Sequence, residues 1–276
     1  MLLNTIAGLS ALLAAVLCIS RNLALWLIPV LFGGFYLSLL LAAFLVLWGF
    51  SAAVDMSKPQ ERDSKLYRRI VMLYIEALIP LVRLKIDTAG LEKMPEAKRI
   101  MLVCNHQNEG DPGILMHYFK RYELSFIAKK EVETMFIMGG LMHKLVCQPI
   151  NRENDREALK SILRCIQLLK SDEVSIGAFP EGGIFDKDKL HPFRSGVFKI
   201  AQKAKVPVVV CTLKGTSDLF HNMKRLKPTH VQLHLVDVID AEEVAAANTV
   251  ELGDRIYAMM LEDLGPEYAP ENTETP

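Results

Sequence analysis

The chain has 276 residues, of which 51% are hydrophobic, so it can form one sizeable domain with an additional apolar segment, and two large domains are not expected. Its 32 basic and 32 acidic side chains cancel, which argues against a nucleic-acid partner because polyanion binding needs a basic excess. The five cysteines are scattered without CxxC spacing, which argues against a disulfide framework and a zinc knuckle and favours a reducing compartment. His230 and His234 would lie on the same face of a strand or helix, but neither has an acidic or cysteine neighbour in the sequence that would complete a metal site. We therefore expect both side chains to be solvated on a strand and to bind no metal.

Two long apolar segments at the start of the chain indicate a membrane anchor. Residues 2–19 and 23–54 contain no charged side chain, and a membrane-spanning helix needs about 20 apolar residues. We expect Pro29 and the Gly33–Gly34 pair to interrupt the second segment. No basic residue precedes the first segment, which argues against a cleaved secretory signal. Residues 1–58 are therefore predicted to form a helical hairpin that spans the membrane or lies within one leaflet.

Residues 59–98 are predicted to form an interfacial helix and a linker. Basic side chains outnumber acidic ones directly after the anchor, which favours a catalytic domain on the cytoplasmic side of the cell membrane. The run from Tyr67 to Lys85 mixes basic and aliphatic residues around Pro80. This composition is typical of a helix along the membrane surface, and an ordinary core helix fits it equally well.

Short apolar runs with β-branched residues alternate with longer amphipathic runs over residues 99–264, which is the pattern of an α/β domain. We expect a central, mostly parallel or mixed sheet flanked by helices. The predicted strands are residues 100–104, 124–128, 146–150, 174–179, 206–213 and 231–238. The predicted helices are residues 112–119, 131–143, 155–169, 193–204 and 249–264. Residues 265–276 lack periodicity and are predicted to be a disordered tail.

The segment 105–112, Asn-His-Gln-Asn-Glu-Gly-Asp-Pro, follows a predicted strand and precedes a predicted helix. This turn can bring the Asp111 carboxylate to the His106 imidazole. A neutral imidazole can accept a hydroxyl proton, and a carboxylate on its other nitrogen fixes the tautomer and stabilises the imidazolium. The pair corresponds to a Ser-His-Asp arrangement in which the substrate hydroxyl replaces serine. Asp before Pro is also the expected cap of a helix, and one carboxylate can serve both roles.

A second candidate cluster, Phe179-Pro180-Glu181-Gly182-Gly183, ends a predicted strand with two residues that lack side chains. Backbone amides can approach a ligand closely at such a place. They can stabilise a tetrahedral oxyanion or hold a phosphate. A simple turn after a strand is the alternative interpretation.

Four sequence blocks, in this order, resemble the glycerolipid acyltransferase family, which includes 1-acylglycerol-3-phosphate acyltransferase. Residues 106–111 match the H-x4-D motif, residues 150–152 (Ile-Asn-Arg) resemble the second block, residues 179–182 match the third, and residues 206–209 resemble the fourth. The resemblance implies that His106 and Asp111 are catalytic. It also implies that Glu181 and Gly182 help to bind a glycerol phosphate acceptor.

The chain departs from the family pattern directly after Gly182, because Gly183 and Ile184 stand where Thr or Ser and then Arg are common. A basic phosphate contact is missing there. Arg194 occupies a place where the family often has a basic residue and is one candidate for the contact. Arg152 is the other, because a guanidinium can bind a phosphate through two hydrogen bonds. The alternative for Arg152 is a surface ion pair with Glu153 or Asp155.

The resemblance implies a membrane-bound enzyme that transfers a fatty acyl group from acyl-coenzyme A or acyl-acyl carrier protein to a lysophospholipid, in the first place lysophosphatidic acid, giving phosphatidic acid. Its partners would be membrane lipids and the acyl thioester donor, acyl carrier protein included, and no bound cofactor is needed. The alternatives are another lysolipid acceptor, a thioesterase or lipase, and a non-catalytic lipid-binding scaffold. No Gly-x-Ser-x-Gly motif is present, which disfavours a serine hydrolase. Cys104 is a conceivable nucleophile, but direct attack by the acceptor hydroxyl needs no covalent enzyme.

Overall fold

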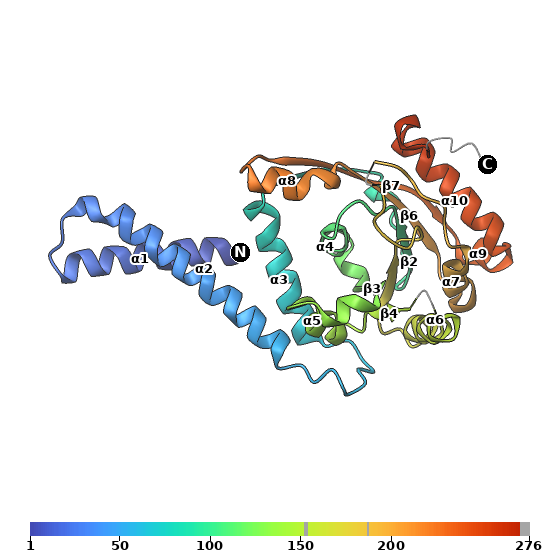
Figure 1. Ribbon diagram of the computed structural model, residues 1–276, viewed down its shortest axis with the longest axis horizontal. Helices are drawn as coiled ribbons and strands as arrows, with labels where there is room; N and C mark the ends of the chain where they lie inside the picture. The colour runs from blue at the N-terminus through green and yellow to red at the C-terminus, as the bar shows by residue number, and fades with distance from the viewer. Residues whose placement is uncertain (152–153, 187, 271–276) are drawn as a thin grey trace.

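A computed structural model describes residues 1–151, 154–186 and 188–270 (Figure 1). Its centre is a seven-stranded sheet with the order β1-β7-β6-β2-β5-β3-β4. Neighbouring strands are parallel except for β6 and β7, which are antiparallel. The predicted mixed α/β architecture is therefore confirmed. The strands are β1 (Leu84–Ala89), β2 (Met101–Cys104), β3 (Leu124–Lys129), β4 (Gln148–Ile150), β5 (Ser175–Ala178), β6 (Val208–Lys214) and β7 (Thr229–Ile239).

Helices cover both faces of the sheet. Figure 1 shows α3, α4 and α5 on one side of the sheet and α6, α7, α9 and α10 on the other. Two buried apolar clusters, one beneath each layer of helices, form the core. The helices of the domain are α3 (Lys65–Leu81), α4 (Asp111–Tyr118), α5 (Met138–Lys144), α6 (Asp155–Lys170), α7 (Lys199–Ala204), α8 (Leu219–Lys224), α9 (Ala241–Ala246) and α10 (Thr249–Leu264).

Strand β1 was not predicted, because the helix assigned to Tyr67–Lys85 ends earlier. Helix α3 stops at Leu81, and Arg83 then adopts a left-handed conformation with φ 57° that turns the chain into β1. The sequence of β1, Leu-Lys-Ile-Asp-Thr-Ala, alternates apolar and polar residues because the strand lies at the edge of the sheet and one of its faces is exposed.

The structure corrects three further expectations. Residues 131–143 do not form one helix, because Ile137, with φ 66°, separates a 3-10 turn (Lys130–Thr134) from α5. Residues 193–204 likewise begin as a 3-10 turn (Ser195–Phe198), and only α7 is α-helical. The chain after Leu264 stays packed for a further turn: Tyr268 is buried, and its carbonyl accepts a 2.8 Å hydrogen bond from the N–H of Leu190.

The two apolar segments form helices α1 (Leu2–Ser20) and α2 (Ile28–Ala52), which lie side by side and project from the domain as a hairpin (Figure 1). The predicted interruption of the second segment is wrong. Pro29 lies in the first turn of α2, where its missing N–H is not needed, and the Gly33–Gly34 pair is helical. Both helices are long and apolar enough to cross a membrane, which is consistent with membrane association.

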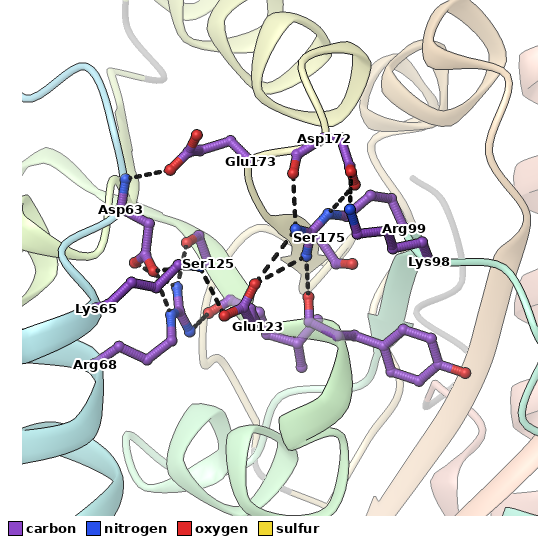
Figure 2. A network of polar contacts seen from close by, with 12 residues as sticks. Asp63, Lys65, Arg68, Lys98, Arg99, Glu123, Ser125, Asp172, Glu173 and Ser175 are labelled. Atoms are coloured by element: carbon purple, nitrogen blue, oxygen red, sulfur yellow. Dashed lines mark hydrogen bonds and ion pairs between the residues drawn. The ribbon is translucent and has the colours of Figure 1, made fainter.

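Helix α3 joins the hairpin to the sheet. Its Tyr74 hydroxyl donates a 2.6 Å hydrogen bond to the carbonyl of Ala43 in α2. On its other face, the Arg68 guanidinium donates two 2.8 Å hydrogen bonds to the Asp63 carboxylate and one of 2.9 Å to the carbonyl of Leu124 at the start of β3 (Figure 2). Helix α3 thus packs on the domain through one face, while its Leu66, Leu78 and Leu81 are exposed. The position of this helix along the membrane surface stays a prediction.

Candidate active site

Asn105 fixes the point at which the chain leaves the sheet. Strand β2 ends at Cys104, which pairs with Cys211 of β6. The side chain of Asn105 then donates a 2.8 Å hydrogen bond to the carbonyl of Leu213 and accepts one of 2.8 Å from its N–H. The side-chain amide has the donor and acceptor of a peptide group, so it extends the pairing with β6 by one step. His106 consequently lies at the carboxyl end of a central strand, where ligand sites of such sheets form.

The structure brings the predicted His106 and Asp111 side chains together. Asp111 is the first residue of α4, and its side chain is fully buried. Its Oδ2 lies 2.9 Å from Nδ1 of His106, whose side chain remains 15% exposed. The buried carboxylate holds one ring nitrogen, and the partial exposure of the imidazole leaves room for a ligand at the ring. This is the geometry of a histidine base with an orienting acid.

The expectation that Asp111 also caps α4 is wrong. Its Oδ2 accepts 2.8 Å hydrogen bonds from the N–H groups of Gln107 and Asn108, both of which precede the helix. The residue at the cap position is Gly110, and no side chain caps the helix there. The Asp111 carboxylate therefore folds the preceding loop back onto itself and holds the backbone directly after His106 as well as the His106 ring.

Glu181 connects the loop of His106 to a distant part of the chain. Its Oε1 accepts a 2.8 Å hydrogen bond from the N–H of His106, and its Oε2 accepts one of 2.9 Å from the N–H of His191. Burial raises the pKa of the Glu181 carboxyl to about 7, against the opposing effect of the two N–H donors, while the nearby Asp111 charge raises it further. Both oxygens are thus engaged by backbone amides, which suits a positioning carboxylate better than one that contacts substrate.

Phe179 orients the histidine ring, a role that the sequence analysis missed. The ring centroids of His106 and Phe179 lie 3.9 Å apart at an interplanar angle of 15°, and Phe179 in turn stacks on Phe126 at 5.7 Å. Stacking fixes the plane of the imidazole, which the contact at Nδ1 alone does not. The available signal was the position of Phe179 at the start of the third block.

The glycine turn lies beside this carboxylate. Gly182 has φ 85°, a conformation that favours glycine, and its N–H donates a 3.0 Å hydrogen bond to the carbonyl of Phe179. The N–H of Arg194 donates one of 2.9 Å to the carbonyl of Pro180, which places Arg194 next to the turn with an exposed side chain. Gly183, also predicted as a site residue, follows in the same turn and is buried. Arg152 lies outside the described residues.

Two other candidates take no part in this cluster. Cys104 is fully buried, and burial raises the pKa of its thiol well above the ordinary value, which disfavours a nucleophilic role. His234 was expected to lack an acidic neighbour, but its Nδ1 lies 3.1 Å from Oδ1 of Asp263 in α10. The described residues contain no group of three or more acidic, histidine or cysteine side chains that could hold a metal ion.

Comparisons with known proteins identify the family of the chain. A family model described as Acyltransferase matches residues 85–214. The chain is 31% identical over 170 residues to a 1-acyl-sn-glycerol-3-phosphate acyltransferase of Bacillus subtilis (strain 168), which covers 60% of this chain and 83% of that protein. It is 30% identical over 179 residues to a probable 1-acyl-sn-glycerol-3-phosphate acyltransferase of Mycoplasma pneumoniae, covering 63% of this chain and 64%, slightly less than two thirds, of that protein.

A solved structure shows the same fold. The crystal structure of the 1-acyl-sn-glycerophosphate (LPA) acyltransferase PlsC from Thermotoga maritima superposes with a TM-score of 0.58 over 71% of this chain and 79% of that chain, at 20% sequence identity. The residues matched by the family model, 85–214, include strands β2 to β6 and the paired His106 and Asp111 that follow β2, but not β7. On the sequence relationship to the Bacillus subtilis enzyme and the matching family model, the chain belongs to the 1-acyl-sn-glycerol-3-phosphate acyltransferase family.

Proposed function

We propose that this protein is a membrane-bound acyltransferase that transfers a fatty acyl group from an acyl thioester to the free hydroxyl of lysophosphatidic acid and so forms phosphatidic acid. The observation that carries the proposal is the 2.9 Å contact between Nδ1 of His106 and Oδ2 of Asp111 at the carboxyl end of β2. The names of the relatives support this acceptor.

In the proposed reaction, His106 acts as the general base. With Nδ1 held by Asp111, Nε2 accepts the proton of the acceptor hydroxyl while the oxygen attacks the thioester carbonyl. A new C–O bond forms, the C–S bond breaks, and the imidazolium returns its proton to the departing thiolate. The Asp111 charge stabilises the imidazolium between these two steps. The proton passes only through the imidazole.

The surrounding residues position the base and the reacting carbonyl. Glu181 holds the backbone of His106, and Phe179 holds its ring. The N–H of Gly183, which follows Gly182 in the turn, stabilises the oxyanion that develops on the carbonyl, because the N–H of Gly182 is already bonded to the carbonyl of Phe179. Glu181 therefore acts through His106 and does not itself contact the acceptor.

Arg194 and Arg152 supply the positive charge for the acceptor phosphate. The N–H of Arg194 donates the hydrogen bond to Pro180 that places the residue beside the glycine turn. Its side chain is exposed and has no ion-pair partner among the described residues. A guanidinium at this place can bind a phosphate through two hydrogen bonds. The arginines at positions 194 and 152 thus replace the basic phosphate contact that is missing directly after Gly182, where Gly183 and Ile184 stand instead of the polar and basic residues common in the family.

The apolar hairpin holds the domain at the bilayer, where both the acceptor and the product reside. Basic residues directly after α2 favour the cytoplasmic side of the cell membrane for the domain. The acyl donor, acyl-coenzyme A or acyl-acyl carrier protein, then reaches the site from the aqueous side. No bound metal or cofactor is required for this chemistry.

The test is an assay of the purified full-length protein in lipid vesicles with a labelled acyl thioester and a panel of lysolipids. Acyl-coenzyme A and acyl-acyl carrier protein are offered in parallel. The expected product is labelled phosphatidic acid. Free fatty acid as the sole product would instead indicate a thioesterase or lipase, and a preference for a different lysolipid would overturn the acceptor. Absence of any product with all donors, in protein that binds lipid, would indicate a scaffold.

A further inference from the structure

Helix α8 and the turn after it expose large apolar side chains in the connection between β6 and β7. Phe220, Met223 and Leu226 are 43%, 38% and 75% exposed. We call residues 220–227 the α8 patch. An apolar group of this kind on a folded domain indicates an interaction site rather than a solvated surface.

The α8 patch is also strongly basic. Lys224, Arg225 and Lys227 are exposed and stand beside the apolar side chains, and residues 219–230 contain no acidic residue. Within the described part of the chain none of these three cations forms an ion pair, whereas Lys214 at the end of β6 pairs with Glu267 at 2.7 Å. The partner of the α8 patch must therefore offer both apolar and anionic groups.

The α8 patch lies on the side of the domain from which the α1–α2 hairpin projects. In Figure 1, α8 lies above the carboxyl end of α3, at the edge of the domain next to the hairpin. Arg83, two residues after α3, donates a hydrogen bond to the carbonyl of Leu226 and so links the two elements. The domain also contacts the hairpin directly before α5, where Phe136 is 66% exposed and stacks on Trp48 of α2 at 6.0 Å.

We propose that the α8 patch docks on an anionic lipid surface and forms a second membrane contact of the domain, independent of the hairpin. Its apolar side chains enter the boundary between headgroups and acyl chains, and its cations contact the lipid phosphates. The proposal rests on the membrane attachment given above, because the position beside the hairpin is what favours a bilayer over a soluble partner. Docking at α8 and anchoring through the hairpin together set the orientation of the sheet relative to the bilayer.

The test uses the full-length protein in vesicles, with an environment-sensitive fluorophore on Leu226→Cys. Val250→Cys is the matched control, because Val250 is also well exposed, at 54%, and lies at the start of α10 on the opposite side of the sheet. Labelled wild-type protein measures the background from the native cysteines. The vesicles contain phosphatidylcholine alone, or phosphatidylcholine with about one third phosphatidylglycerol, which provides the negative surface potential.

In the anionic vesicles we expect the label at position 226 to shift to the emission of an apolar environment and to be quenched by nitroxide lipids. The label at position 250 should keep its aqueous emission. The charge reversal K224E/R225E/K227E should lower the docking equilibrium constant by at least about two orders of magnitude, since each lost basic residue costs roughly fivefold and the added carboxylates are repelled by the surface. An aqueous emission at position 226 in protein that floats with anionic vesicles, or an unchanged signal after charge reversal, would overturn the proposal.

A second measurement separates this proposal from the proposed function. Acyl transfer to lysophosphatidic acid dispersed in neutral detergent should proceed at the same rate in the wild-type protein and in the charge-reversed variant, because the α8 patch does not contact the reacting groups. Absence of transfer in both proteins would refute the proposed activity and leave the docking result unaffected. A rate loss confined to the variant in detergent would show that the α8 patch serves the reaction itself and would contradict the docking role.

Discussion

The N–H of His106 donates a 2.8 Å hydrogen bond to Oε1 of Glu181, 75 residues further along the chain. The same carboxylate accepts a second bond from the N–H of His191. The H-x4-D loop and the glycine turn therefore form one unit, in which the second motif holds the backbone of the first. Substitutions in either motif should consequently affect the same step.

Substitution of Glu181 by glutamine should slow the reaction without removing the base. A glutamine amide offers one acceptor oxygen, so either the N–H of His106 or that of His191 faces the NH2 group and loses its partner. We expect kcat to fall by about tenfold and the free energy of unfolding to fall by about 1–3 kcal/mol. Steady-state kinetics and denaturant unfolding in mild detergent measure both.

The matched control is Glu173→Gln, because Oε1 of Glu173 also accepts a backbone hydrogen bond, of 2.9 Å from Asp63, but lies outside the site. This variant should keep the wild-type kcat. Equal kcat values for the wild-type protein and Glu181→Gln would show that catalysis does not need the hydrogen bonds that the Glu181 carboxylate accepts from the N–H groups of His106 and His191.

The pH dependence of stability should report the buried Glu181 carboxyl. Its pKa is raised from 4.5 to about 7 in the folded protein, so the folded state binds more protons than the unfolded state between these values. The contribution of Glu181 is therefore most favourable below about pH 4.5 and is lost as the pH rises to about 7, by at most about 3 kcal/mol. The measurement is the free energy of unfolding of the wild-type protein minus that of Glu181→Gln, at several pH values. This difference should fall as the pH rises from about 4.5 to about 7. A value that instead grows with pH would contradict the raised pKa.

Replacement of Asp111 by asparagine should remove the partner of the imidazolium. The asparagine oxygen can still accept from the N–H groups of Gln107 and Asn108, so the loop should fold with a cost of about 1–3 kcal/mol for the buried NH2 group. Without the charge at Nδ1 of His106, kcat should fall by about 10³–10⁴-fold.

The control for this substitution is Asp263→Asn, which changes another histidine–aspartate pair, that of Asp263 with His234. Acyl transfer should stay at the wild-type level. Wild-type turnover by Asp111→Asn would remove Asp111 from the mechanism, and similar losses in the two variants would indicate a general effect on folding.

Substitution of Arg194 by alanine should weaken binding of the acceptor phosphate. Loss of a charge-assisted hydrogen bond should raise the KM for lysophosphatidic acid by about tenfold or more, while kcat changes little. A monoacylglycerol, which lacks the phosphate, should show no such change. Arg255→Ala on α10, where the arginine pairs with Glu243, serves as the control. Equal effects on both acceptors would show that Arg194 does not contact the phosphate.

The mixed α/β architecture could be predicted from the sequence, whereas the edge strand β1 and the interruption of the helix predicted at residues 131–143 could not. Buried strands such as β2 and β6 are continuous apolar runs, so their positions could be predicted, whereas the edge strand β1 alternates like a surface segment. Residues 131–143 have helical periodicity, but Ile137 adopts φ 66°, a conformation rare for a β-branched residue that only the tertiary packing imposes.

The candidate site was predictable where chemistry follows from residue type and spacing, as for His106 and Asp111. The hydrogen bonds that these carboxylates accept from backbone N–H groups could not be predicted. Nothing in the sequence around Glu181 indicates that both of its oxygens bind N–H groups. Nothing around Asp111 indicates that its carboxylate binds the N–H groups of the preceding loop instead of capping α4. The stacking of Phe179 on His106 likewise depends on how β2 and β5 lie side by side in the sheet.

The most direct test of the account is acyl transfer by His106→Ala beside His234→Ala in the same vesicles, with labelled acyl thioester and lysophosphatidic acid. Alanine at position 106 keeps the N–H that binds Glu181 and removes only the imidazole, whereas His234 pairs with Asp263 and lies on β7, which β6 separates from β2. We predict that His234→Ala forms phosphatidic acid at the wild-type rate and that His106→Ala is slower by about 10²–10⁴-fold while remaining folded. Wild-type rates from His106→Ala would contradict the account.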